Sequence, residues 1–109
     1  MNSAAIKRQN SQYTPLPTDS WTDVTETPSS GETVVVVDVV IGSNQSSAVQ
    51  QFRAWDGTTA KAVWTVSTAG DRSESISFQQ HVHLPAGYRL QVSASGQSYV
   101  TVNYYVVGY

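Results

Sequence analysis

The residues best suited to metal chemistry are two histidines, His81 and His83, which are separated only by Val82. Side chains two apart on a β-strand point to the same side, so both imidazoles could reach one metal ion. A third protein ligand is required, and no nearby acidic residue or histidine supplies it within the chain. Three copies around a threefold axis could complete such a site together. Two solvated histidines at a strand end are the simpler interpretation, and we predict no metal and no cofactor.

Catalytic arrangements are absent from the sequence. A glycosidase needs two carboxylates that face one cleft, and nothing marks such a pair among the eight acidic residues. Asp56 is used in a turn, and Glu26 and Glu32 flank a loop without a motif around them. The sequence also has no phosphate-binding glycine loop, no nucleophile elbow and no Ser-His-Asp order. We therefore expect a protein that is not an enzyme.

The three tryptophans could form a sugar-binding platform. Trp64 alternates with Ala62 and Val66, so we predict that it lies in the core. Trp55 precedes an Asp-Gly turn and Trp21 opens a strand, so these two could be exposed. A place in the core or in a subunit interface is the simpler interpretation of both rings. A module that binds host glycans through Trp21 and Trp55 is the alternative from a different class of function.

Length and charge narrow the classes of function that remain open to this chain. The 109 residues fit one domain, and only 13% of them are charged, with a formal net charge of −2. Nucleic-acid binding needs a clustered basic surface, whereas the basic residues are scattered apart from Lys7 and Arg8. The longest apolar stretch, residues 34–41, contains Asp38 and is too short to cross a bilayer as a helix. We therefore expect neither nucleic acid nor a membrane as a partner.

The elements that must position these residues are predicted to be strands. From Trp21 onward the apolar residues follow a period of two, and no window has a helical stripe. Turn sequences recur at short intervals, and Asp56-Gly57 is the strongest hairpin signal among them. The spacing predicts an all-β fold: a single antiparallel β-sandwich, jelly-roll-like, with seven or eight strands. The expected strands cover residues 21–27, 32–41, 48–55, 59–67, 75–82, 88–93 and 99–107.

Residues 1–20 differ from the sandwich domain predicted over 21–109. They are polar and aperiodic, and Pro15 and Pro17 near their end favour an extended backbone. The sequence therefore predicts an extended N-terminal arm. Apolar and basic residues are spaced along it, and we predict contacts of the arm with a partner at Ile6, Lys7, Arg8, Tyr13 and Leu16.

Two predicted strands carry bulky residues on both sides, although a sandwich strand normally buries only one. By strict alternation, Val34, Val36, Asp38 and Val40 share the second side of the strand over 32–41. The last strand pairs a valine-rich side with a side that holds tyrosines. Either the arm or a neighbouring copy must cover these second sides.

Tyrosine suits a partly hydrated subunit interface, because its ring buries area while its hydroxyl finds a partner. We therefore predict self-association through a face made of Tyr99, Tyr105, Tyr109, Val36 and Asp38. The carboxylate of Asp38 would either need a partner there or lie hydrated at the rim of a sheet.

The order of these segments resembles a known class of proteins. A polar arm and a Val-rich strand precede Gly42-Ser43-Asn44-Gln45-Ser46-Ser47, and Leu84-Pro85-Ala86-Gly87-Tyr88-Arg89-Leu90-Gln91-Val92 precedes a closing Val/Tyr strand. This pattern is similar to small β-sandwich structural proteins of tailed bacteriophages, including capsid decoration (cement) proteins and related tail or fibre modules. The resemblance covers about residues 21–109 and contains no invariant functional motif.

The resemblance implies trimers seated on capsid symmetry axes, with N-terminal arms that clamp adjacent capsid subunits. We accordingly expect a virion protein, assembled in the host cytoplasm, that forms a homotrimer, binds the major capsid protein and stabilises the head. A dimer is an open alternative to the trimer. A neck, tail or fibre-base module of the same particle is the nearest alternative function.

Overall fold

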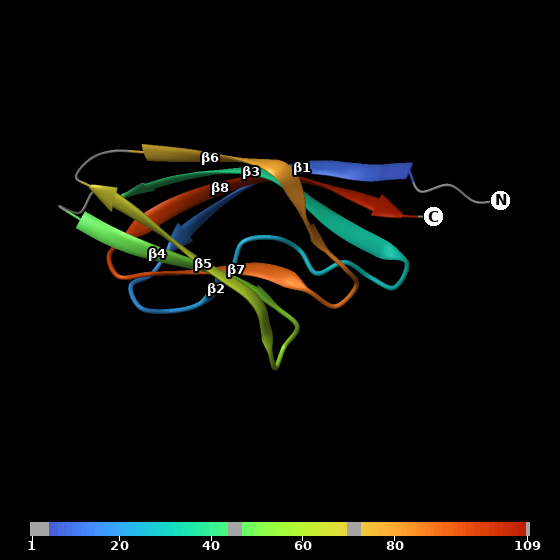
Figure 1. The fold of residues 1–109 in the computed structure, drawn as a ribbon, viewed down its shortest axis with the longest axis horizontal. Coiled ribbons are helices and arrows are strands. Elements are labelled where there is room, and N and C mark those ends of the chain that lie inside the picture. The colour runs from blue at the N-terminus through green and yellow to red at the C-terminus, as the bar shows by residue number, and fades with distance from the viewer. Residues whose placement is uncertain (1–4, 44–46, 70–72, 109) are drawn as a thin grey trace.

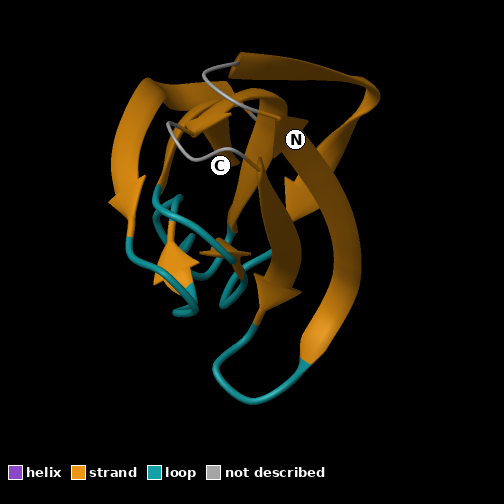
Figure 2. Ribbon diagram, turned by 90° about the vertical axis from the view of Figure 1, so that its left-hand side faces the viewer, coloured by secondary structure: helices purple, strands orange, loops and turns teal. Residues whose placement is uncertain are grey.

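The strands of this chain form two layers with an apolar core between them (Figure 1). The computed structural model describes residues 5–43, 47–69 and 73–108, with side chains at 5–43, 48–61, 65 and 81–108. Every regular element within these residues is a strand, as the colours of Figure 2 show. The strands are β1 (Ala5–Leu16), β2 (Thr22–Asp23), β3 (Glu32–Ser43), β4 (Ser47–Trp55), β5 (Ala60–Ala69), β6 (Ser73–Leu84), β7 (Arg89–Ala94) and β8 (Ser98–Gly108).

The order of the strands is that of a jelly roll. The first sheet has the order β1-β8-β3-β6, and the second has the order β2-β7-β4-β5. Within them β1 pairs with β8, β2 with β7, β3 with β6 and β4 with β5, all antiparallel. These are the pairs of one long hairpin folded over on itself, which gives a two-sheet jelly roll. The prediction of an all-β, antiparallel, jelly-roll-like sandwich is confirmed.

The segment predicted as an arm is extended, but it is a strand of the first sheet. β1 pairs with β8 from Ala5↔Gly108 to Leu16↔Ser98. It lies at the edge of the sheet, where Pro15 is tolerated. Residues 5–16 are therefore part of the sandwich and do not stand outside it.

A β-bulge in β3 decides which of its valines reach the core. Val36 pairs with Tyr104 of β8 and Asp38 pairs with Asn103, so Val37 is an extra residue that reverses the alternation. The core side of β3 therefore holds Val34, Val36, Val39 and Ile41, which are all fully buried. Strict alternation had placed Val36 on the self-association face. That prediction was wrong, because Val36 is 0% exposed and belongs to the core.

The core is built from alternate residues of both sheets. In β7, Leu90 and Val92 are fully buried, whereas Arg89 and Ser93 on the other side are only partly buried. Each fully buried side chain of this size stabilises the fold by roughly 1.5–3 kcal/mol. The side chain of Trp64, which was predicted to lie in this core, and all of Tyr109 are outside the described residues.

The predicted Asp56-Gly57 turn joins β4 to β5. Gly57 has a φ of 102°, a backbone conformation that side chains disfavour. The carboxylate of Asp56 accepts hydrogen bonds from the backbone N–H of Thr58 at 2.8 Å and of Thr59 at 2.6 Å. These bonds stabilise the ionised carboxylate and lower the pKa of Asp56. The prediction of a hairpin at this position is confirmed.

Candidate interaction surfaces

The outer side of the first sheet carries tyrosines around a central row of polar side chains. Alternate residues of β8 lie half-buried on this side, while its other residues are buried on the core side. We call this surface the tyrosine face. It consists of Ser11 and Tyr13 from β1, Val37, Asp38 and Val40 from β3, His81 from β6, and Tyr99, Asn103 and Tyr105 from β8.

Rings pair at two places on the tyrosine face. Tyr13 stacks on Tyr99 with ring centroids 6.2 Å apart and planes 10° apart. Tyr105 meets His81 edge to face at 6.3 Å. Aromatic pairs of this kind contribute about 0.5–1.5 kcal/mol beyond the area that they bury. The two described tyrosines of the predicted self-association face therefore lie on the outer side of the sheet, each held by a ring neighbour.

A row of hydrogen bonds crosses the middle of the same face. The hydroxyl of Ser11 donates to Oδ1 of Asn103, and Nδ2 of Asn103 donates to Oδ1 of Asp38 at 2.5 Å. The half-buried carboxylate of Asp38 thus has a partner within its own chain. A shallow depression of about 310 Å³ lies over this row, and Gln9 and Val37 contribute to its lining.

The predicted arm contacts divide into two groups. Ile6, Lys7 and Tyr13 are exposed on β1, and the exposed fractions of Ile6 and Tyr13 are 55% and 61%. Leu16 is only 2% exposed and packs in the core, so its prediction as a partner contact was wrong. The guanidinium of Arg8 is already paired within the chain, which leaves it unsuited to the predicted partner contact.

Arg8 connects the start of β1 to the segment before β3 and to the first residue of β3. Its Nε donates to Oε1 of Glu26 at 2.7 Å, and its Nη1 lies 3.3 Å from Oε2 of Glu32. The two carboxylates raise the pKa of Arg8. Arg8 in turn lowers the pKa of Glu32, and the backbone N–H of Ser29 adds to this effect. Both shifts favour the charged forms, so this ion pair persists at neutral pH.

The two histidines lie on the outer side of β6. Val82 between them packs against the core, so His81 and His83 both point away from it and are exposed. The two imidazoles therefore lie on the same side of the strand, as their spacing of two residues predicts. Among the described side chains, no group of three or more His, Cys, Asp or Glu residues is placed to hold a metal ion.

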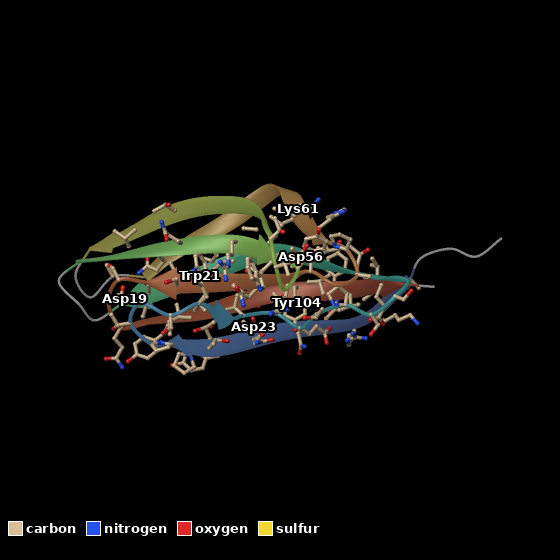
Figure 3. The ribbon with its side chains drawn as sticks, turned by 90° about the horizontal axis from the view of Figure 1, so that it is seen from below. Asp19, Trp21, Asp23, Asp56, Lys61 and Tyr104 are labelled. Carbon is tan, nitrogen blue, oxygen red and sulfur yellow. The ribbon has the colours of Figure 1, made fainter. Side chains whose placement is uncertain are left out.

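The outer side of the second sheet carries a different surface. Figure 3 shows the molecule from the side of this sheet, with Trp21 and Asp23 labelled. The guanidinium carbon of Arg53 lies 4.0 Å from the ring centroid of Trp21 and 3.8 Å from that of Trp55. Contacts this short are cation–π interactions. We call this surface the tryptophan–arginine cluster. It consists of Trp21, Asp23, Arg53, Trp55, Arg89 and Gln91.

Hydrogen bonds fix the polar members of this cluster. Nε of Arg53 donates to Oε1 of Gln91 at 2.8 Å, and Nε2 of Gln91 donates to Oδ1 of Asp23 at 2.7 Å. Nε of Arg89 donates to the same Asp23 oxygen at 2.8 Å. The network joins β2, β7 and β4, and Gln91 at its centre is only 7% exposed.

Sequence reasoning identified the two tryptophans of this cluster but missed Arg53. The available signal was alternation, because Arg53 and Trp55 are two apart and share one side of β4. The pairing of Arg53 with Gln91 across β4 and β7 joins residues far apart in the chain, and nothing in the local pattern indicates it.

No family model and no curated protein matches this sequence. The described residues include no helix of the length and apolar character needed to span a membrane. The two outer surfaces are therefore the features from which a function can be inferred.

Proposed function

We propose that this chain is a structural protein of a virus particle, a capsid decoration (cement) protein that self-associates and binds capsid subunits to stabilise a phage head. The tyrosine face is the observation that carries the proposal. It combines paired aromatic rings with side chains that the described part of the chain leaves exposed, such as Tyr13 at 61% and Val40 at 37% exposure. Tyrosine is enriched in protein–protein interfaces relative to the rest of the protein surface.

The edge of the first sheet provides a second contact for assembly. Among the described strands, β1 pairs with β8 alone, so no described strand occupies the other edge of this 12-residue strand and another chain could pair there. Exposed strand edges pair readily with extended segments of partners. The exposed side chains of Ile6 and Lys7 would lie at such a contact. A subunit that joins several capsid sites through one oligomer gains avidity without any single strong contact.

Sedimentation velocity over a wide range of protein concentrations tests the self-association. We expect the wild-type chain to form an oligomer and the double variant Tyr13→Ser with Val40→Ser to be monomeric. Both replaced residues are exposed, so the variant should keep its fold. Val49→Ser is the matched control, because Val49 is exposed to 42% on the outer side of the other sheet. A wild-type chain that stays monomeric at high concentration would contradict the proposal.

Binding to capsid subunits needs a separate test. Removing the first residues of the chain is unsuitable, because it would delete β1 and the buried Leu16 from the sandwich. Lys7→Glu leaves the strand in place and reverses one charge at its exposed edge. We expect this variant to bind purified particles more weakly while its oligomeric state is unchanged.

The position of the chain in an imaged particle distinguishes the head from the tail. Many copies on the capsid surface agree with a decoration protein. A few copies at the neck, tail or fibre base would instead favour a neck, tail or fibre-base module of the same particle.

A further inference from the structure

The tryptophan–arginine cluster has hydrogen-bond donors that no described residue uses. Nε of Arg53 is bound to Gln91, but its two Nη groups have no partner among the described residues. The same holds for the Nη groups of Arg89, whose Nε is bound to Asp23. From this arrangement we propose that the cluster is a binding site for the carboxylate of an acidic saccharide.

The guanidinium of Arg53 is fixed in place before any ligand arrives. Thr22 pairs with Val92 and Trp55 pairs with Arg89, so Trp21 and Trp55 lie to either side of the Arg53–Gln91 pair along the sheet. Both indole rings lie about 4 Å from its guanidinium carbon. A planar guanidinium held in this way presents two parallel N–H groups, which match the two oxygens of a carboxylate.

The charge of the cluster favours an anion. The two arginines and one aspartate of the cluster leave it with one positive charge, although the whole chain has a formal net charge of −2. Asp19 of the neighbouring depression is negative, so the excess positive charge lies at Arg53 and not over the whole site. The carboxylate of Asp23 is bound to Arg89 and Gln91 and leaves the outer donors of Arg53 unopposed. Because an arginine stays charged at all physiological pH values, the site would be ready to bind at neutral pH.

A shallow depression next to the cluster has the polarity that a sugar ring needs. It measures about 250 Å³ and is lined by Asp19, Val49, Gln51, Ser93, Ala94 and Ser95. The Gln51–Ser93 pair is the next outward-facing pair after Arg53–Gln91, about 7 Å along the strands. Hydroxyl, amide and carboxylate groups can bind sugar hydroxyls there, while Trp21, 36% exposed, offers an aromatic surface beside them.

Charge and polarity together define the ligand class. A neutral sugar would use the depression and the indole, but its hydroxyl oxygens would not accept the charge-assisted pair of hydrogen bonds that the Nη groups of Arg53 offer. An inorganic anion would use Arg53 but would leave the depression empty. A sugar ring that carries a carboxylate satisfies both parts of the surface, and the depression has room for only one or two rings.

Titration of the full chain with trigalacturonate, followed by NMR of the tryptophan indole N–H groups, tests the proposal. The fully methyl-esterified trisaccharide is the matched ligand, because it has the same rings without the charges. We expect saturable shifts of the Trp21 and Trp55 signals with the acid, and about tenfold weaker binding of the ester. Signals are assigned with Trp21→Phe and Trp55→Phe. Equal affinity for the acid and the ester, or no shift of either signal, would overturn the proposal.

Two variants locate the binding energy. Arg53→Lys keeps the positive charge but loses the planar pair of N–H groups, so we expect about tenfold weaker binding of trigalacturonate. Unchanged affinity in this variant would overturn the role of the guanidinium. Tyr13→Ser with Val40→Ser is the control, because both residues lie on the opposite sheet and binding should be unchanged. Since that variant also disrupts the tyrosine face, the saccharide site and the proposed assembly can succeed or fail independently.

Discussion

At the scale of single residues, the hydroxyl of Tyr104 joins the first strand to the core. Tyr104 is 3% exposed, and its hydroxyl accepts a hydrogen bond from Nδ2 of Asn10 and donates one to Oε1 of Gln12, both at 3.1 Å. It also accepts a bond from the backbone N–H of Glu26 at 3.4 Å. These bonds give the buried hydroxyl of Tyr104 partners on the exposed Asn10 and the half-buried Gln12, and a buried polar group is costly when it lacks such a partner.

We expect Tyr104→Phe to lower the free energy of unfolding by roughly 1–3 kcal/mol, because Asn10 and Gln12 lose their common partner. Urea denaturation measures this difference. Tyr105→Phe is the matched control on the neighbouring residue, since the ring that contacts His81 is kept. An equal loss in both variants would show that the hydroxyl of Tyr104 has no special role.

Glu32 should make the stability of the fold depend on pH in the acidic range. Arg8 lowers the pKa of Glu32 below its ordinary value of 4.5. A carboxylate whose pKa is lower in the folded state stabilises the protein above the ordinary pKa, and this contribution disappears as the pH falls through the folded value. We expect the melting temperature of wild type to fall more steeply below pH 4.5 than that of Glu32→Gln. Parallel profiles would contradict the ion pair with Arg8.

At the scale of elements, the bulge in β3 shifts the alternation of inward and outward side chains by one residue at Val37. Val36 and Val40 would share a side in a regular strand, but Val36 is 0% exposed and Val40 is 37% exposed. The extra residue, Val37, allows β3 to bury valines on the core side along its whole length while Asp38 stays on the outer side with Asn103. Bulges of this kind are used to redirect side chains.

A pair of valine substitutions tests this assignment. We expect Val36→Ala to cost roughly 1.5–3 kcal/mol of unfolding free energy, because it leaves a cavity in the core. Val40→Ala should change it by no more than about 0.5 kcal/mol. Thermal or urea unfolding compares the two. Similar values for both variants would mean that β3 is regular.

The sequence allowed the fold class to be predicted, because the alternation from Trp21 onward and the turns such as Asp56-Gly57 are local signals. It did not reveal β1, whose inner side is polar apart from residues near Leu16 and is stabilised by Tyr104, far away in the chain. Nor did it reveal the bulge at Val37, since a run of valines has no feature that marks an extra residue. The environment of Arg53 could not be predicted from the local sequence either, because it depends on how β2, β7 and β4 pair.

At the scale of the whole molecule, the two sheets present surfaces with different chemistry. The tyrosine face is aromatic and apolar, with a hydrogen-bonded polar row, and the tryptophan–arginine cluster carries a positive charge. Because the apolar core separates them, one surface can be occupied without blocking the other. A subunit that assembles through the first sheet would therefore keep the second sheet exposed to its surroundings.

Assembly through the tyrosine face predicts a melting temperature that rises with protein concentration, since association stabilises the folded state by mass action. We expect this dependence for wild type and for Val49→Ser. It should vanish for the double variant with Tyr13→Ser and Val40→Ser. Differential scanning calorimetry at several concentrations measures it, and a wild-type melting temperature independent of concentration would contradict association.

The pairing of Ala5 with Gly108 brings the first and last described strand ends to the same end of the sandwich (Figure 1). A short linker between them could close the backbone into a ring, and new ends could then be opened at the exposed Asp56-Gly57 turn. Such a circular permutant would keep every strand pair described above. Two cargo molecules fused next to Ala5 and Gly108 would, for the same reason, be displayed side by side.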